Sequence, residues 1–286
     1  MSSQITTAFV NQYSSNIQML SQQMGSLLRG AVDVESVNGE KAFFDQVGSA
    51  AAVLRTTRHA DTPLIDTPHS RRMVTMSDYE YADLIDDQDK VRLLVDPTST
   101  YARAAASAMG RAMDDVIIAA AIGTAKTGKD GSTSTALPSS QKIAHGSANL
   151  TIAKLLSAKQ IMDESSVDPS ISRYLVCAPD QISALLGTTQ VTSSDFNTVR
   201  ALATGEINSY LGFKFIVSNR LTTDSDGNRA VIAFAGDGLK LAMGKEPTAR
   251  IDERSDKSYA TQVYYCQTIG ATRMEEAKVV EIACTE

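Results

Sequence analysis

Residues 96–123, DPTSTYARAAASAMGRAMDDVIIAAAIG, decide the fold of this 286-residue chain. Asp96 is a good helix N-cap, and Pro97 suits the first helical position because its missing N–H would have no partner there. Nine alanines follow, and we expect Gly123 to end the helix in a left-handed conformation. A helix over 97–122 would be about 39 Å long, whereas a compact chain of this size has a radius of gyration of about 19 Å. The stretch therefore predicts a spine on which the other segments are arranged.

The predicted spine has two different faces. An apolar stripe at three- and four-residue spacing is expected to face the core, and it consists of Tyr101, Ala105, Met109, Met113, Val116 and Ala120. Arg103 and Ser107 lie on the opposite side, where Arg111 and Asp115 have the spacing of a helical ion pair. From Ile118 onward the sequence is apolar on every side, so the C-terminal end of the helix should be buried.

The composition is that of a soluble globular protein, with 43% hydrophobic and 21% charged residues. No apolar run approaches the roughly 18 residues of a membrane span, and the N-terminus lacks the pattern of a secretory signal. Cys177, Cys266 and Cys284 are odd in number and widely spaced, which indicates reduced thiols and neither a disulfide framework nor a zinc site. The net charge of −6 argues against a protein that binds nucleic acid over a broad basic surface.

The segments before the spine are predicted to lack a core of their own. Residues 1–35 are rich in Ser, Gln and Asn, so they predict an arm that is either helical in part or extended against a neighbour. Residues 50–57 and 70–76 are strand candidates on either side of turn signals at 63–68, and they would form a long hairpin. A two-stranded ribbon is marginal in water and needs a partner surface. The candidate contact residues on the ribbon are four arginines, Arg55, Arg58, Arg71 and Arg72.

Six acidic residues lie within residues 78–89, directly after the predicted hairpin. Two interpretations of this run stay open, because charge pattern alone does not separate them. The acids can form a solvated face, or they can meet the arginines of the next subunit in a ring of identical copies. Under the second interpretation, the candidate partners are Asp83, Asp86, Asp87 and Asp89.

No catalytic, cofactor or metal site is expected. Residues 123–130, GTAKTGKD, are one residue short of a phosphate-binding loop, since Asp130 stands where the motif needs Ser or Thr to hold magnesium. Such a loop also follows a strand, whereas this one follows a helix. Eleven Gly, Ser or Thr residues in 123–140 favour a flexible loop without nucleotide affinity. His59 and His69 flank the predicted hairpin tip, where exposed turn histidines are commoner than a metal site.

The rest of the chain alternates helices and strands, which indicates an α+β or α/β domain over 150–240. Expected helices cover 151–165, 179–187 and 195–203, and expected strands cover 173–177, 213–217 and 230–235, with a turn at 224–227. Four more strand candidates follow at 239–243, 249–252, 259–268 and 278–282.

Three stretches carry a resemblance to a known family. They are DTPHSRRMVTMSDYEYADLIDDQDKVRLLVDPTSTYA at 66–102, TIAKLLSAKQIMDESSVDPSISRYLVCAP at 151–179, and GEINSYLGFKFIVSNRL at 205–221. In this order they resemble the major capsid proteins of tailed bacteriophages, which have the Hong Kong 97 fold. The resemblance covers nearly the whole chain and rests on the ordered set, since no single stretch is as specific as a catalytic triad.

The resemblance implies an α+β capsid fold of the Hong Kong 97 type, built from four parts. These are an N-terminal arm (1–35), an extended hairpin loop (36–92), a peripheral domain (93–149 and 245–286) that holds the spine helix, and an axial domain (150–244). It also implies a structural protein without cofactor or membrane, which assembles in the host bacterial cytoplasm into hexamers and pentamers of an icosahedral virion around double-stranded DNA. Portal, scaffolding or decoration proteins would be further partners. Encapsulin compartments, which house cargo enzymes, share the fold and are the alternative.

Overall fold

The computed structural model describes residues 21–59, 61–85, 98–187, 209–224 and 226–286. Within these ranges the chain has three α-helices and three β-sheets, which confirms the expected mixture of helix and sheet. It divides into two compact units, of which the first comprises residues 1–26, 78–111 and 245–267 and the second comprises 27–77, 112–244 and 268–286. None of the helices in the described ranges is long and apolar enough to cross a membrane.

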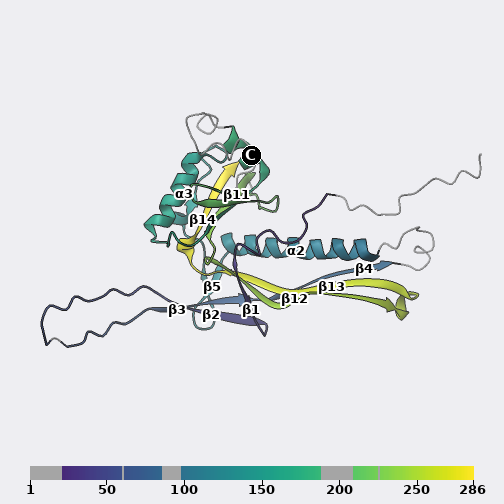
Figure 1. Cartoon of the computed structure of the whole chain (residues 1–286), viewed down its shortest axis with the longest axis horizontal. Coiled ribbons are helices and arrows are strands. Elements are labelled where there is room, and N and C mark those ends of the chain that lie inside the picture. The colour runs from purple at the N-terminus through teal and green to yellow at the C-terminus, as the bar shows by residue number, and fades with distance from the viewer. Residues whose placement is uncertain (1–20, 60, 86–97, 188–208, 225) are drawn as a thin grey trace, which may run out of the picture. The chain divides into compact units, whose positions relative to one another are not determined.

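The spine is helix α2, Thr98–Ile122, so the helix predicted from the sequence is confirmed (Figure 1). Its buried face consists of Ala105, Met109, Met113, Ile117, Ile118 and Ala121. The predicted stripe is therefore confirmed from Ala105 to Met113, whereas Tyr101 at its start is exposed. Beyond Met113 the buried positions are 117 and 121 and not the predicted 116 and 120. Four helical residues turn about 400°, closer to a full turn than the 300° of three residues, so 117 and 121 follow Met113 on the core side. Ala119 is exposed, so the C-terminal end is not buried on every side.

The predicted ion pair along the polar side of α2 is wrong. Arg111 donates from Nη1 to the side-chain oxygen of Gln22 at 2.9 Å and to the carbonyl of Gln23 at 3.1 Å. Asp115 accepts a hydrogen bond of 2.7 Å from Nε of Arg220 and a second from Nη2 of the same guanidinium. A two-pronged arginine–carboxylate contact is stronger than a single pair along a helix, so Asp115 takes the more distant partner.

The segment before the first strand is fixed against α2 at two points. In the second unit, the fully buried carboxylate of Asp114 accepts the backbone N–H groups of Leu27 and Leu28, both at 3.1 Å. In the first unit, Gly110 lies so close to Gly25 that a Cβ at 110 would be 2.3 Å from the Gly25 carbonyl carbon. The end of the predicted arm is therefore bound to the spine, while residues 1–20 lie outside the described residues.

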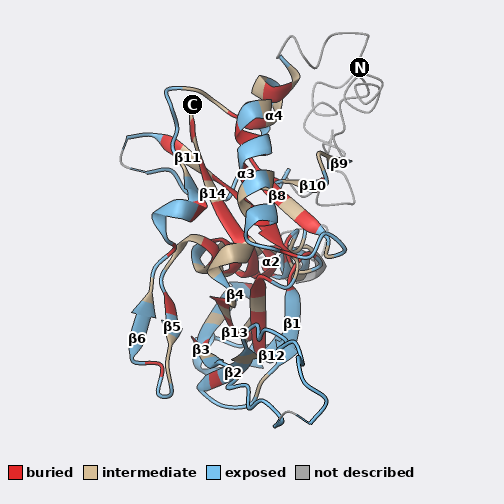
Figure 2. Cartoon of the chain, turned by 90° about the vertical axis from the view of Figure 1, so that its left-hand side faces the viewer, coloured by how far each residue is buried: buried red, intermediate tan, exposed pale blue. Residues whose placement is uncertain are grey.

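A six-stranded sheet forms the core of the second unit. Its order is β7 (Lys142–Ile143), β14 (Val279–Thr285), β11 (Asn228–Ala235), β8 (Arg173–Cys177), β10 (Phe213–Val217) and β9 (Ser209–Tyr210). Buried residues concentrate in the central strands (Figure 2), where Leu175, Val231 and Ala233 have no exposed surface. Helix α3 (Ile152–Glu164) packs along β14, and helix α4 (Pro179–Leu186) follows β8.

Local signals predicted this region well. Helices α3 and α4 lie where they were expected, and the hydroxyl of Thr151 caps α3 by accepting the N–H of Lys154 at 3.3 Å. The strands predicted over 173–177, 213–217 and 230–235 are also confirmed as β8, β10 and β11. The helix predicted over 195–203 lies outside the described residues.

Two four-stranded sheets complete the fold. One has the order β1 (Asp33–Ser36), β12 (Leu239–Arg254), β13 (Ala260–Arg273) and β4 (Ser77–Ile85). The other has the order β2 (Lys41–Val47), β3 (His69–Thr75), β5 (Ala125–Thr127) and β6 (Thr133–Thr135). In the described part of the chain, short 3-10 turns connect elements at η2 (Ser139–Gln141), η4 (Ser255–Lys257) and η5 (Glu276–Lys278). The strand candidates at 239–243 and 249–252 are one continuous strand, β12, rather than two.

The contact between Gly110 and Gly25 generates a prediction. Helix propensity alone favours alanine over glycine by about 1 kcal/mol, but the added methyl group would overlap the backbone of residues 25 and 26. We therefore expect Gly110→Ala to lower the free energy of unfolding by about 1–3 kcal/mol. Chemical denaturation of the unassembled chain measures it. Gly30→Ala is the matched control, because a Cβ at 30 meets nothing within 4 Å. A Gly110→Ala chain as stable as wild type would contradict the close contact.

Candidate inter-subunit contact surface

The predicted hairpin is present, but its first strand lies earlier in the sequence than predicted. Strand β2, Lys41–Val47, pairs antiparallel with β3, Phe43 opposite Met73 and Val47 opposite His69. Residues 50–57 were predicted as this strand and form none. Buried and exposed residues alternate along 41–47, which explains why this stretch and not 50–57 is the strand. Ala42 and Phe44 are buried with Val74 and Met76 in one apolar cluster. Residues 48–59 and 61–68 lie in a long loop that extends beyond the two strands (Figure 1).

The loop between β2 and β3 exposes large apolar side chains. Leu64 is 99% exposed and Leu54 is 84% exposed, and Val53 and Ile65 also lie on the surface. Full burial of such a side chain stabilises a protein by roughly 1.5–3 kcal/mol. Because these side chains are exposed in the second unit, most of that stabilisation is not gained within the unit. The loop therefore has the composition of a surface that packs on something else.

The two arginines that the sequence predicted in the loop are exposed. Arg55 donates from Nε to the carbonyl of Thr57 at 3.0 Å and from Nη2 to the carbonyl of Arg58. Arg58 is exposed, and no hydrogen bond or ion pair of its side chain occurs within the described part of the chain. These two positive charges thus have no acidic partner among the described residues and are available for one.

Arg71, on β3, already has an acidic partner in the same chain. Its Nη2 lies 3.2 Å from Oδ2 of Asp45 on the neighbouring strand, and Nε also contacts this carboxylate. The Arg71 guanidinium stacks over the ring of Phe43 with 5.5 Å to the ring centroid. The hydrogen bond from Arg71 lowers the pKa of the Asp45 carboxyl group. This internal pair was not among the contacts expected for Arg71 from the sequence.

Arg72 is buried and anchors the base of the hairpin. Its Nη2 lies 2.6 Å from Oε2 of Glu276, and Nε lies 3.4 Å from Oε1 of Gln46. Gln46 donates in turn to the carbonyl of Met274 at 2.8 Å. These bonds attach β2 and β3 to the chain around η5.

Glu276 also lies beside the arginine that closes the spine helix. Arg273 has no exposed surface, and its Nη1 donates to the carbonyls of Ala121 and Gly123, both at 2.8 Å. Its Nη2 donates to the carbonyl of Thr135 at 3.0 Å, and its Nε lies 3.6 Å from Oε1 of Glu276. Burial lowers the pKa of this guanidinium. Gly123 is not left-handed, as the sequence analysis expected, because the Arg273 side chain satisfies the helix C-terminus instead.

The predicted acidic partners lie only partly within the described residues. Asp83 is on β4, where its Oδ1 accepts the N–H of Leu84 at 2.9 Å and its Oδ2 lies 3.5 Å from the hydroxyl of Tyr81. Asp86, Asp87 and Asp89 lie outside the described residues. Both interpretations of the acidic run, a solvated face or a contact with the arginines of the next subunit, therefore stay open.

The glycine-rich stretch after the spine was predicted to be a flexible loop, but it contains two short strands. Strands β5 and β6 form a hairpin, and β5 pairs with β3, so the stretch extends the sheet of β2 and β3. Gly128 and Gly131 take the positive φ angles of the turn, 90° and 67°. A Cβ at 131 would also be 2.3 Å from Sδ of Met73, so both the positive φ angle and the lack of space favour glycine at this position. Lys129 lies in this turn and not at the start of a helix, which a phosphate-binding loop would need.

The described residues hold no group of three or more His, Cys, Asp or Glu side chains that could bind a metal ion. Cys177 and Cys284 are buried in the six-stranded sheet. Burial raises the pKa of these thiols to about 12 and about 11, so they stay protonated.

The sequence analysis missed three residues at the hairpin base, Asp45, Arg273 and Glu276. Asp45 was detectable in principle, because it lies opposite Arg71 once the register of β2 is known. The other two had no local signal, since Glu276 is 204 residues from Arg72 along the chain.

A model of the phage capsid protein family matches residues 5–286. Among solved structures, the capsid of the cyanophage P-SCSP1u matches with a TM-score of 0.76 and 18% identity, over 99% of this chain and 94% of that one. The capsid of Ralstonia phage GP4 also matches with a TM-score of 0.76, at 11% identity over 97% and 95% of the two chains. Mycobacterium phage Che8 matches with 0.70 and 16%, over 96% and 97%. No curated protein matches the sequence.

Glu276 is predicted to stabilise the hairpin base. Glu276→Gln keeps the shape of the side chain but leaves two buried guanidinium groups without their carboxylate, so the free energy of unfolding should fall by about 1–3 kcal/mol. Chemical denaturation measures it. Glu275→Gln is the control, because Glu275 is half exposed and its pair with Lys278 is worth little. Equal losses from the two changes would show that Glu276 has no special role.

Proposed function

The chain belongs to the phage capsid protein family and is a major capsid protein of a phage shell, and we propose that its copies assemble into hexamers and pentamers of an icosahedral head that encloses double-stranded DNA. The observation that carries this assembly is the loop between β2 and β3, whose leucines, Leu54 and Leu64, are 84% and 99% exposed. A surface of this kind is stable when a second copy covers it.

The overall charge fits a shell around DNA. With 33 acidic and 27 basic residues the chain has a net charge of −6. A coat of this charge repels the phosphate backbone, so the packaged DNA stays mobile. We propose no sequence-specific contact with DNA, no enzymatic activity, and assembly in the cytoplasm of the host bacterium.

The four parts expected from the family resemblance are proposed to divide the work of assembly. Residues 1–35 would be the arm and 36–92 the extended loop, both reaching neighbouring copies. Residues 93–149 and 245–286 would form the peripheral domain, and 150–244 the axial domain at the centre of each capsomer. Portal, scaffolding or decoration proteins would contact the finished or growing shell.

The proposed assembly predicts that the native protein is found in closed shells. Light scattering after size-exclusion chromatography should give the mass of capsomers or shells, and electron microscopy should show icosahedral particles. Particles from the natural source should contain DNA. A stable monomer at high concentration would contradict the proposal, and shells filled with cargo enzymes would show an encapsulin compartment instead.

We further propose that the exposed arginines of the loop meet acids of a neighbouring copy. Arg55 and Arg58 are the main candidates, since Arg71 and Arg72 have partners in their own chain. Asp83, Asp86, Asp87 and Asp89 remain the candidate partners. Each exposed pair would contribute only about 0.2–1 kcal/mol, but the contact recurs in every copy of the shell.

Arg55→Glu with Arg58→Glu is therefore expected to leave the chain folded and to raise the protein concentration needed for assembly, most strongly at low salt. Light scattering across a concentration series measures the threshold. Arg71→Glu with Arg72→Glu would be a poorer test, because it also breaks two internal pairs. Lys41→Glu with Lys126→Glu is the charge-matched control outside the loop. Assembly of the loop variant at the wild-type concentration would rule out these pairs.

A further inference from the structure

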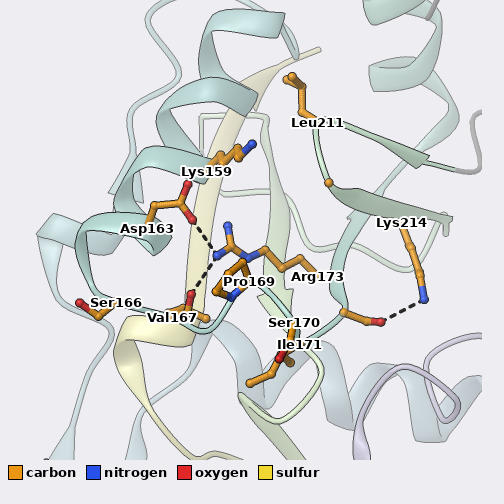
Figure 3. Close-up of a pocket in the computed structure, with 12 residues that line it drawn as sticks. Lys159, Asp163, Ser166, Val167, Pro169, Ser170, Ile171, Arg173, Leu211 and Lys214 are labelled. Atoms are coloured by element: carbon orange, nitrogen blue, oxygen red, sulfur yellow. Dashed lines mark hydrogen bonds and ion pairs between the residues drawn. The ribbon is translucent and has the colours of Figure 1, made fainter.

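A cavity of about 730 Å³ in the second unit is lined by three cationic side chains, yet these do not converge on one point. The ammonium of Lys214 is bonded to the hydroxyl of Ser172 at 3.0 Å and points away from Lys159 (Figure 3). Arg173 instead faces Asp163, with 2.7 Å between its Nη2 and Oδ1 of the carboxylate. The described residues around this cavity therefore offer no set of donors that one small ligand could contact together.

A different pair of reactive side chains does meet, in the first unit. Lys245 lies on β12, and Cys266 lies on the neighbouring strand β13. The Lys245 ammonium donates a hydrogen bond to the Cys266 sulfur, and the distance between Nζ and Sγ is 2.9 Å. An oxidised cysteine sulfur condenses with a nitrogen that lies beside it. The two groups are therefore placed to become the two ends of one covalent bond.

The partner of Lys245 sets it apart from other lysines of the chain. Lys142, Lys240 and Lys278 each lie 2.6–2.7 Å from a carboxylate oxygen, as surface lysines commonly do. Within the described part of the chain, Lys245 makes no ion pair, and the hydrogen bond of its ammonium group goes to the Cys266 sulfur. The amine is thus directed at the sulfur and is not held by a carboxylate elsewhere.

Cys266 is the cysteine that an oxidant can reach. It is half-buried beside the exposed Lys245, whereas Cys177 and Cys284 have no exposed surface. Burial raises the pKa of those two thiols, and the thiolate is the form that oxidants attack. Both are enclosed in the six-stranded sheet, so neither is available as a disulfide partner for Cys266. The group that can react with an oxidised Cys266 is therefore the Lys245 amine.

Two further side chains surround this sulfur. Tyr264 precedes Cys266 by two residues on β13, so both side chains lie on the same face of the sheet. The Tyr264 hydroxyl donates to Oε1 of Glu80, on β4, at 2.9 Å. This hydrogen bond raises the pKa of Tyr264 to about 12, and the Cys266 thiol adds to the shift. The phenol therefore stays protonated, which leaves the Lys245 amine as the nucleophile beside the sulfur.

We propose that Lys245 and Cys266 form a reversible covalent cross-link between β12 and β13, a sulfenamide, when the chain meets a peroxide. In the first step the Cys266 sulfur attacks the peroxide and becomes a sulfenic acid, which reduces the peroxide and releases water. In the second step the neutral Lys245 amine attacks the same sulfur. The S–N bond forms, the S–O bond breaks, and the hydroxyl leaves with a proton of the amine as a second water. Two equivalents of a thiol reductant restore both side chains and become a disulfide.

The cross-link would hold the two longest strands of the first four-stranded sheet together. It joins positions 21 residues apart in the sequence, and a covalent bond across such a loop restricts the unfolded chain. Both reacting groups belong to one chain, so the reaction does not depend on the proposed assembly. It is therefore measured on the unassembled chain.

The first experiment treats the unassembled chain with hydrogen peroxide and measures its intact mass and its proteolytic peptides without reductant. The wild-type chain should lose the mass of two hydrogen atoms, and Lys245 and Cys266 should occur in one linked pair of peptides. Dithiothreitol should reverse both changes. A wild-type chain that only gains oxygen atoms, or a Cys266 linked to a different residue, would overturn the proposal.

The matched variant is Lys245→Arg, because arginine keeps the positive charge beside the sulfur but stays protonated and does not form the bond. This variant should gain one oxygen atom, and dimedone, which traps sulfenic acids, should label it at least tenfold more than wild type. Lys257→Gln is the control and should form the link as wild type does, since Lys257 is an exposed lysine in η4, between the same two strands. Equal dimedone labelling of wild type and Lys245→Arg would contradict the role of the amine.

The second experiment compares chemical denaturation of the oxidised and the reduced chain. The oxidised wild-type chain should unfold at a higher denaturant concentration than the reduced one, because the link joins β12 to β13. Lys245→Arg should show no such increase on oxidation, and dithiothreitol should abolish the increase in wild type. An increase of the same size in Lys245→Arg would show that the link is not its cause and would overturn the proposed effect on the two strands.

Discussion

The fold of the second unit depends on one buried positive charge. Arg273 donates to two carbonyls at the end of α2 and to one at the end of β6, so a single guanidinium satisfies groups from two segments. Glu276 lies between this guanidinium and that of Arg72, on the extended hairpin. A buried arginine is costly unless it is paired and hydrogen-bonded. The arrangement meets that cost only when spine, hairpin and β6 are all in place.

This anchoring divides the hairpin into a fixed base and an exposed end. At the base, Phe44 and Val74 are buried, and Arg72 is held by Glu276 and Gln46. Between Val47 and His69 the described residues form no further strand, and Leu54 and Leu64 are exposed. A coat protein needs both properties, because the base gives each copy a defined shape and the loop supplies surface for its neighbours.

Short-range patterns predicted the elements whose signals lie within a few residues. Helix α3 has its cap at Thr151, α4 has Pro179 at its start, and β8 and β10 are apolar runs. The capsid fold itself was expected from the order of three stretches and is confirmed. The first strand of the hairpin was misplaced because 50–57 and 41–47 both have strand composition. Only pairing with β3 over a shared apolar face separates them.

The sequence by itself determined the spine, because alanine content and helical spacing act within one turn of the chain and need no distant partner. The tertiary structure decided where the charges go. Arg111 and Asp115 are spaced to pair with each other, yet each bonds to a distant segment. Arg273 replaces the expected left-handed Gly123 at the end of the spine. A charged side chain takes the partner with the best geometry and burial, and which groups compete is known only once the chain is folded.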